Sequence, residues 1–185
     1  MHGLGQKAVA GESARPYRAH VGNILMTAPP APDAETVVPA AVDLRAIDEG
    51  DLEAVGHAYW QTYLSTPEEM SLRAAIDDVR AAWDGDYGRW LPDGCVSAWS
   101  DGGLVGAIIT VEDAPWPDVP RGPFVVDLFV RPDQRRRGIG RALVRTVQAR
   151  LRTAISLRVD ETAGPARRLY ASVGFRTPTR DEPAV

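Results

Sequence analysis

The chain has 185 residues, of which 44% are hydrophobic and 25% are charged, and its formal net charge is −4. This length favours one globular domain with a sizeable core, and no apolar run approaches the roughly 18 residues that predict a membrane helix. A single cysteine, Cys95, excludes an internal disulfide, and with three scattered histidines it offers too few good ligands for a zinc site. The free cysteine and the lack of a signal-peptide pattern predict a cytoplasmic protein. Acidic composition with arginines crowded between Arg131 and Arg168 favours a small anionic ligand over a nucleic acid.

Residues 1–40 are predicted to form a disordered tail or linker outside the fold. They are rich in Gly, Ala and Pro without periodicity and end in Ala28-Pro-Pro-Ala-Pro-Asp33. Met26, just before that segment, is a candidate for the true start of the protein. We therefore expect one folded domain over residues 41–185.

The first half of this domain is predicted to contain a strand, two helices and a hairpin. A strand near 42–46 precedes a helix capped by Asp48, whose apolar positions at helical spacing are Leu52, Val55, Tyr59 and Tyr63. Thr66-Pro67-Glu68-Glu69 matches a helix start, with Thr as cap and Pro at the first position. Strands near 95–100 and 104–111 follow, joined by a hairpin turn at Asp101-Gly-Gly103.

The second half contains the most informative segment of the chain. A Pro-rich connection, 114–122, leads to an apolar strand from Phe124 to Val130, and the chain then crosses a Gly- and Arg-rich turn into an amphipathic helix. A strand over 155–159 and a helix beginning near Pro165 follow. The order β, α, α, β, β, β, α, β, α predicts an α/β fold with a mixed central sheet flanked by helices.

The turn Arg135-Arg-Arg-Gly138-Ile-Gly140 has the properties of a phosphate-binding site. Glycine lets the backbone approach a ligand closely because no Cβ stands in the way. The first N–H groups of the following helix have no partner inside the helix and carry the positive end of its dipole. Neighbouring guanidinium groups can add two donors each to phosphate oxygens.

This strand, Arg135-x-x-Gly138-x-Gly140 and helix resemble the acyl-CoA-binding motif of the GCN5-related N-acetyltransferases (the GNAT family). Ala166-Arg-Arg-Leu-Tyr170-Ala-Ser-Val-Gly174-Phe175 resembles the second signature of that family, a helix that carries Tyr and ends in Gly-Phe. The resemblance runs from about Val42 to Phe175. It implies the single-domain GNAT fold, acetyl-CoA as co-substrate and no metal.

The resemblance also implies roles for particular residues. The backbone of Leu128, Phe129 and Val130 would pair with the pantetheine arm, and a strand amide near Phe129 would stabilise the oxyanion. The pyrophosphate would be held by the segment comprising Arg135, Arg136, Arg137, Gly138, Ile139, Gly140 and Arg141. Tyr170 would be the general acid that protonates the departing thiolate, since a phenol with a pKa of roughly 10 is protonated at neutral pH.

The chain departs from the family pattern near its C-terminus. Family members usually continue past Gly-Phe with two further strands, whereas only ten residues follow Phe175 here. The C-terminal strands are therefore expected to be short or missing, and the chain is truncated, has lost a strand, or borrows one from a partner in a homodimer. Gly164 stands where the family often has Asn.

The general base and the acceptor site remain open at this stage. Val126 occupies the position of a Glu found in some members, which leaves Asp127, Glu112, Asp113 or a water chain as candidates; Asp127 could equally cap a turn or pair with an arginine. The segment from Trp83 to Trp90 and Trp116 combine aromatic rings with carboxylates, which suits a cationic amine but equally suits packing at the edge of the core. Cys95 and His57 are interpreted as structural.

These observations predict an N-acetyltransferase that transfers the acetyl group of acetyl-CoA directly to a primary amine in a ternary complex. The alternative is an acyl-CoA-binding module of the same fold that has lost turnover, to which the short C-terminus would point. Arginines at 141, 145, 150 and 152 fall on an exposed helix face and do not by themselves indicate nucleic-acid binding.

Overall fold

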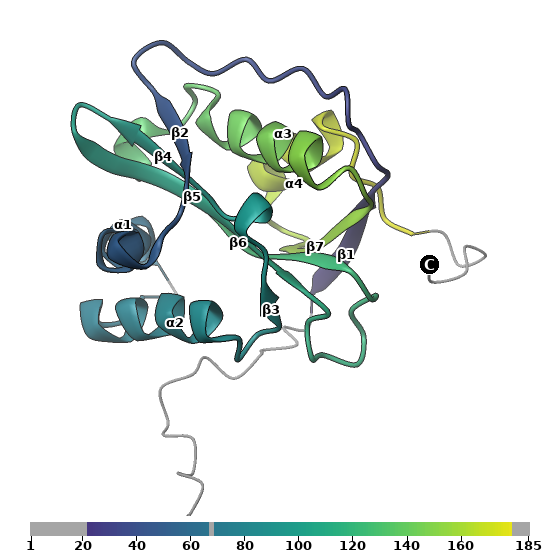
Figure 1. The fold of residues 1–185 in the computed structure, drawn as a ribbon, viewed down its shortest axis with the longest axis horizontal. Helices are drawn as coiled ribbons and strands as arrows, with labels where there is room; N and C mark the ends of the chain where they lie inside the picture. The colour runs from purple at the N-terminus through teal and green to yellow at the C-terminus, as the bar shows by residue number, and fades with distance from the viewer. Residues whose placement is uncertain (1–21, 67–68, 179–185) are drawn as a thin grey trace, which may run out of the picture.

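The computed structural model describes residues 22–66 and 69–178, which form one mixed β-sheet covered by helices on both faces (Figure 1). The strands are β1 (Asn23–Ala28), β2 (Asp43–Ala46), β3 (Arg89–Trp90), β4 (Val96–Ser100), β5 (Gly103–Glu112), β6 (Pro123–Val130) and β7 (Ile155–Asp160). The helices are α1 (Leu52–Tyr63), α2 (Leu72–Asp84), α3 (Ile139–Leu151) and α4 (Gly164–Ser172), and the short 3₁₀ helices are η1 (Glu49–Asp51), η2 (Pro92–Gly94) and η3 (Pro132–Gln134). The predicted α/β fold with a mixed, helix-flanked sheet is confirmed.

The strands follow the order β1-β7-β6-β5-β4-β2, with β3 paired to β5 beyond the end of β4. Neighbouring strands are antiparallel except for β6 and β7, which run parallel. A parallel pair needs a crossover connection, and α3 supplies it between β6 and β7. This crossover is what places the start of α3 directly after the end of β6.

The sheet separates two hydrophobic clusters. The cluster on the α3 and α4 side includes Leu143, Val147, Leu157 and Phe175. The cluster on the α1 and α2 side includes Leu52, Tyr59, Val79 and Phe129. Strand side chains alternate between the two faces, so the cluster to which each belongs tells which face it occupies.

Strand β1 corrects the prediction that residues 1–40 lie outside the fold. It pairs antiparallel with β7 from Asn23 opposite Asp160 to Ala28 opposite Ile155, and its Met26 and Ala28 are buried. The strand is fixed by a tertiary contact, since it covers an edge of β7 that would otherwise expose a ladder of N–H and C=O groups. Residues 1–21 of the predicted tail lie outside the described residues.

The described residues that follow α4, up to residue 178, contain no further strand. After α4, the chain makes one antiparallel bridge, in which the backbone of Arg176 exchanges hydrogen bonds with Thr27 on the outer edge of β1. The place beside β7 is therefore filled by the chain's own N-terminal segment, β1. No strand from another copy is needed to fill it.

The start of α2 is a second correction. Its N-cap is Ser71, whose hydroxyl accepts a hydrogen bond from the backbone N–H of Ala74 at 3.1 Å, five residues after the predicted cap Thr66. The Thr66 hydroxyl donates to the carbonyl of Tyr63 instead and closes the turn at the end of α1. Pro67 and Glu68 lie outside the described residues.

The hairpin turn between β4 and β5 is as predicted, because Asp101 and Gly102 both have positive φ, which two-residue hairpin turns require.

Candidate active site

Strands β6 and β7 separate after a short paired region and leave an opening in the sheet. Their pairing comprises Phe124 opposite Ser156 and Val125 opposite Leu157. At the same level the pairing between β5 and β6 shifts by one residue, so that Val126 is an extra residue on β6. Such a bulge bends a strand and increases its twist, which explains why the C-terminal half of β6 moves away from β7.

The backbone of this half of β6 offers hydrogen-bonding groups to the opening. The N–H of Arg131 donates to the carbonyl of Val105 at 2.9 Å, and Phe129 lies opposite Ala107 in the same ladder. Because alternate residues of a strand point their polar groups to opposite sides, Leu128 and Val130 direct theirs away from β5 and toward the opening. The Arg135 Nε–H donates to the Val130 carbonyl at 3.1 Å, which confirms its direction. Of the three predicted strand residues, Phe129 instead contributes a buried ring packed on Tyr59.

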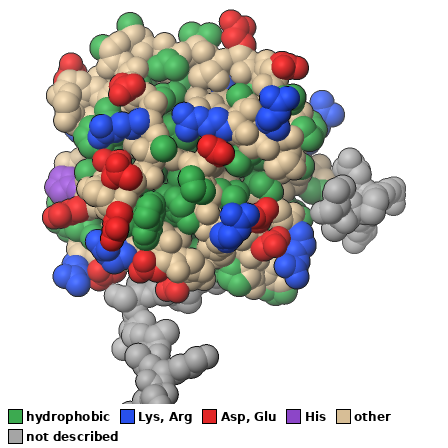
Figure 2. Space-filling model, in the orientation of Figure 1, with side chains coloured by type: hydrophobic (Ala, Val, Ile, Leu, Met, Phe, Trp, Pro, Cys, Tyr) green, Lys and Arg blue, Asp and Glu red, His purple; other side chains and the backbone are tan. Residues whose placement is uncertain are grey.

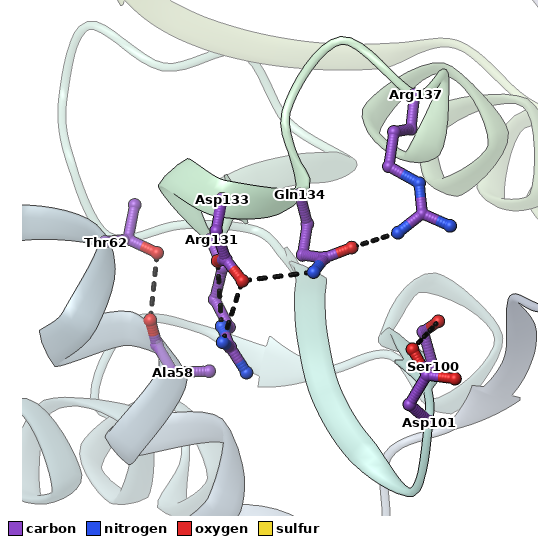
Figure 3. Close-up of polar contacts among 8 residues, drawn as sticks. All are labelled: Ala58, Thr62, Ser100, Asp101, Arg131, Asp133, Gln134 and Arg137. Atoms are coloured by element: carbon purple, nitrogen blue, oxygen red, sulfur yellow. Dashed lines mark hydrogen bonds and ion pairs between the residues drawn. The ribbon is translucent and has the colours of Figure 1, made fainter.

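The loop between β6 and α3 is held by side-chain contacts of its own (Figure 3). Asp133 accepts hydrogen bonds from Arg131 at 3.2 and 3.0 Å and from the Gln134 amide at 3.0 Å, and Arg137 donates to the Gln134 carbonyl oxygen. The Gln134 hydrogen bond, and then Arg131, lower the pKa of the Asp133 carboxyl. These exposed contacts order the loop ahead of the helix.

The end of this loop is a turn with the backbone geometry of an anion site. Arg136 and Gly138 both have positive φ, and the helix begins immediately afterwards at Ile139. Ala142 N–H makes the first hydrogen bond of the helix, to the Gly138 carbonyl, so the amides of the preceding residues have no acceptor within α3. A Cβ on Gly140 would lie 3.2 Å from Leu169 of α4 and 3.8 Å from Val130, so glycine keeps the space between the loop, β6 and α4 open.

Tyr170 lies on α4 in the core cluster of the α3 side. Its side chain is 7% exposed and packs on Phe175 with ring centroids 5.7 Å apart. Burial, and secondarily the negative charge of Asp127, raise the pKa of its phenol above the ordinary value. Tyr170 is therefore protonated at neutral pH and coupled to the carboxylate on β6.

Among the three candidate bases, only Asp127 lies at the opening. Glu112 forms an ion pair with Arg89, and Asp113 pairs with Arg121 at 3.6 Å and accepts the Gly122 N–H at 2.9 Å, so both stabilise the ends of the β5–β6 connection. Asp127 follows the bulge on β6, and the Tyr63 hydroxyl donates to its Oδ1 at 3.5 Å from the end of α1.

The aromatic residues considered for the acceptor divide into two groups. Trp83 and Trp90 pack on each other with centroids 5.0 Å apart and border the core cluster of the α1 side. Trp116, in the Pro-rich connection, lies between Tyr87 (6.0 Å) and Phe124 of β6 (5.7 Å). The group around Trp116 is therefore the one that contacts β6.

Sequence reasoning missed the ion pair between Arg158 of β7 and Asp118 of the Pro-rich connection. In the sequence, Arg158 occupies a polar position of an alternating strand and resembles an ordinary solvent-facing residue.

Cys95 and His57 have the structural placement expected for them. Cys95 is buried and exchanges hydrogen bonds with the backbone of Thr110, and burial raises its pKa to about 12, whereas His57 is exposed beside Trp60.

Among residues 22–66 and 69–178, no group of three or more His, Cys, Asp or Glu side chains is placed to hold a metal ion. No helix in this part of the chain has the length and hydrophobicity to cross a bilayer.

Figure 2 shows hydrophobic side chains gathered in the middle of one face, with Lys and Arg side chains across the half that holds α3 and more Asp and Glu toward α1 and α2.

This mixed sheet, with its bulged strand and its glycine turn at a helix N-terminus, has the fold of GNAT acetyltransferases. The model of the acetyltransferase (GNAT) family matches residues 52–175, and the chain belongs to that family. No match was found among curated proteins.

Solved structures with the same fold share little sequence with the chain. A GCN5-related N-acetyltransferase from Sphaerobacter thermophilus is 22% identical with a TM-score of 0.58, and the match covers 84% of this chain and 48% of that one. The ribosomal-protein-S18-alanine N-acetyltransferase of Escherichia coli is 21% identical with a TM-score of 0.53, over 75% of this chain and 79% of that one. AAC(6')-Iy, solved in complex with the bisubstrate analogue CoA-S-monomethyl-acetylneamine, is 19% identical with a TM-score of 0.55, over 76% of this chain and 95% of that one. The chain thus spans about half of the Sphaerobacter protein, and these likenesses establish the fold.

Proposed function

We propose that this protein transfers the acetyl group of acetyl-CoA to a primary amine in a ternary complex. The observation that carries the proposal is the opening between β6 and β7, which lies immediately before the glycine turn and the N-terminus of α3. An extended thioester arm and a pyrophosphate are the two chemical groups that such a strand edge and such a helix end bind.

In this proposal the pantetheine arm pairs with the backbone groups that Leu128 and Val130 direct into the opening. The pyrophosphate accepts hydrogen bonds from the amides of residues 136–141, where Gly138 and Gly140 permit close approach. Arg135 and Arg137 act mainly on the loop itself, through the Val130 carbonyl and Gln134. Arg136 and Arg141 are exposed, have no ion pair with another described residue, and supply positive charge.

The chemical step requires an unprotonated amine and a proton for the leaving group. The amine nitrogen attacks the thioester carbonyl carbon, a new N–C bond forms, and the C–S bond breaks. Tyr170 donates its phenolic proton to the departing CoA thiolate, and Asp127 accepts the proton that the amine loses, directly or through water. A strand amide of β6 that faces the opening, at Leu128 or Val130, stabilises the oxyanion.

The second candidate function is an acyl-CoA-binding module without turnover. Its motivation was the absence of the C-terminal strands that usually wall the acceptor site. Since β1 occupies the edge beside β7, the sheet is extended in that region, and this observation favours the enzyme. A cytoplasmic location stays a prediction from the sequence.

A thiol-release assay tests this function. Purified protein is mixed with acetyl-CoA and a panel of primary amines, and free CoA is followed with a thiol reagent. We expect CoA release that depends on both the amine and the protein, together with a mass increase of the amine by one acetyl group. Binding of acetyl-CoA without release on any amine would support the module instead.

A further inference from the structure

Arg158 lies on the face of the sheet that the proposed acceptor would approach. Its neighbours on β7, Leu157 and Val159, belong to the cluster on the α3 side. Alternation along the strand therefore directs Arg158 to the opposite face, the side of α1 and α2. Asp127 faces the same side, as its hydrogen bond from Tyr63 at the end of α1 shows.

The strand register places these two charged residues on either side of the opening. The last β6–β7 pair is Val125 opposite Leu157. Asp127 follows the bulge on β6 and Arg158 is the next residue on β7, so a carboxylate and a guanidinium flank the point where the strands separate. Such an arrangement is complementary to a molecule that carries both a positive and a negative group.

One partner of Arg158 comes from a loop. The Arg158 side chain is 11% exposed, whereas the side chain of its partner Asp118 is 56% exposed and lies in the Pro-rich connection between β5 and β6. Burial lowers the pKa of the Arg158 guanidinium from its ordinary value. A guanidinium withdrawn from water needs an anionic or hydrogen-bonding partner, but an exposed carboxylate loses little when another anion replaces it.

The same loop connects this ion pair to the aromatic group that borders β6. Trp116, two residues before Asp118, packs on Phe124, and Phe124 lies opposite Ser156 on β7. On this face, the aromatic pair Trp116 and Phe124, the carboxylate of Asp127 on β6 and the loop carboxylate of Asp118 thus lie in the region of Arg158.

We propose that Arg158 binds a carboxylate of the acceptor, so that the substrate class is an amine that also carries a carboxylate, such as an amino acid. The inference rests on the proposed function and makes it more specific. The acceptor's amine lies toward Asp127 and its carboxylate takes the place of Asp118 on Arg158. Without an acceptor, Asp118 keeps the guanidinium paired.

The competing explanation is that the ion pair only fastens the Pro-rich connection to the sheet. The two explanations differ in what happens when each partner is neutralised. Arg158→Gln and Asp118→Asn both break the ion pair with side chains of nearly the same size. If the pair is only a fastening, each variant affects the carboxylated and the decarboxylated member of an amine pair to the same extent. If Arg158 binds the acceptor, only Arg158→Gln loses the carboxylate-bearing amines selectively.

The test uses three matched pairs of amines: L-lysine with 1,5-diaminopentane, L-phenylalanine with 2-phenylethylamine, and L-alanine with ethylamine. Binding to the full chain in the presence of CoA is measured by calorimetry, and kcat/KM is measured by CoA release. We expect the wild-type protein to prefer the carboxylated member of at least one pair. Arg158→Gln should lower the affinity and the kcat/KM for the carboxylated amine by about 10- to 100-fold, which is the effect of losing a hydrogen-bonded charge partner. The affinity and kcat/KM of this variant for the decarboxylated amine, and its Kd for acetyl-CoA, should be unchanged.

Asp118→Asn should keep the preference for the carboxylated amine. Equal affinity of the wild-type protein for both members of every pair, or equal losses in the two variants, would overturn the inference. Failure of the wild-type protein to bind acetyl-CoA would instead refute the proposed function, and the calorimetric comparison of the amines distinguishes these outcomes.

Discussion

Replacing Tyr170 by Phe is expected to slow acetyl transfer strongly while acetyl-CoA binding and the fold are retained. The ring is buried against Phe175 and stays in place, so the substitution removes only the hydroxyl. That hydroxyl makes no hydrogen bond to another described residue, so its loss should cost less than about 1 kcal/mol of unfolding free energy. A lost general acid, by contrast, lowers kcat by roughly 10²–10⁴-fold, or about 3–5 kcal/mol of transition-state stabilisation.

The assay combines kcat from CoA release with Kd for acetyl-CoA from calorimetry, and Ser97→Ala is the control because it also removes one buried hydroxyl. The Ser97 hydroxyl donates to the Arg45 carbonyl at 3.2 Å on β4, outside the residues assigned to the site, so the control should change stability more than kcat. Because the folded-state pKa of Tyr170 is raised, the neutral phenol is present at all pH values below its ordinary pKa of roughly 10. The wild-type kcat should therefore show no alkaline decline from this group below that pH. A kcat loss of less than about tenfold in Tyr170→Phe, or a parallel loss of binding, would refute the general-acid role and indicate packing.

The remaining predictions concern the fold, the thiol and the base. Met26→Ala should lower the unfolding free energy by about 2–3 kcal/mol in a denaturant titration, because Met26 is buried. The control Val37→Ala, at a residue that is 74% exposed, should change it by less than about 0.5 kcal/mol. Equal effects of the two variants would contradict the burial of β1. Cys95 should react with a thiol reagent at neutral pH only on unfolding, since burial raises its pKa to about 12 and keeps it protonated, and rapid labelling of the native protein would disprove this. Asp127→Asn should lower kcat at pH 7 by about 10²-fold and Glu112→Gln should not, and the reverse order of the two variants would exclude Asp127 as the base.

The sequence was sufficient to predict the segments where local and tertiary preferences agree. The apolar strand β6, the glycine turn and the amphipathic helix α3 lie where their patterns placed them, and the hairpin at Asp101 and Gly102 has the positive φ values that its turn residues favour. The start of α2 was mispredicted because two capping sequences lie close together. Local rules rank Thr66-Pro67 highly, but Ser71 is the residue whose hydroxyl reaches an amide of the helix.

Strand β1 and the Arg158 ion pair could not be predicted because both depend on distant partners. Residues 23–28 form a short segment next to a Pro-rich stretch, and only the edge of β7 makes them a strand. Arg158 looks like an exposed residue until the opposite face of the sheet and the Asp118 loop are in place. The pairing that separates Asp127 from the other candidate bases is equally tertiary, since Glu112, Asp113 and Asp127 are equivalent as carboxylates in the sequence.

The most direct test of the central claim is a calorimetric titration of the purified protein with acetyl-CoA, for the wild type, Gly140→Asp and Gly102→Asp. A Cβ at Gly140 would enter the space between the loop, β6 and α4, and a carboxylate about 4 Å from a phosphate charge costs about 4 kcal/mol at an effective dielectric constant near 20. Gly102 has no atom within 4 Å of such a Cβ, but its φ of +75° is left-handed, so Gly102→Asp should lower the melting temperature through the hairpin turn without filling the binding space. The account predicts micromolar binding to the wild type and Gly102→Asp, with binding weakened by about 10²–10³-fold in Gly140→Asp at an unchanged melting temperature. Absence of binding to the wild type at millimolar acetyl-CoA, or equal binding to all three proteins, would contradict it.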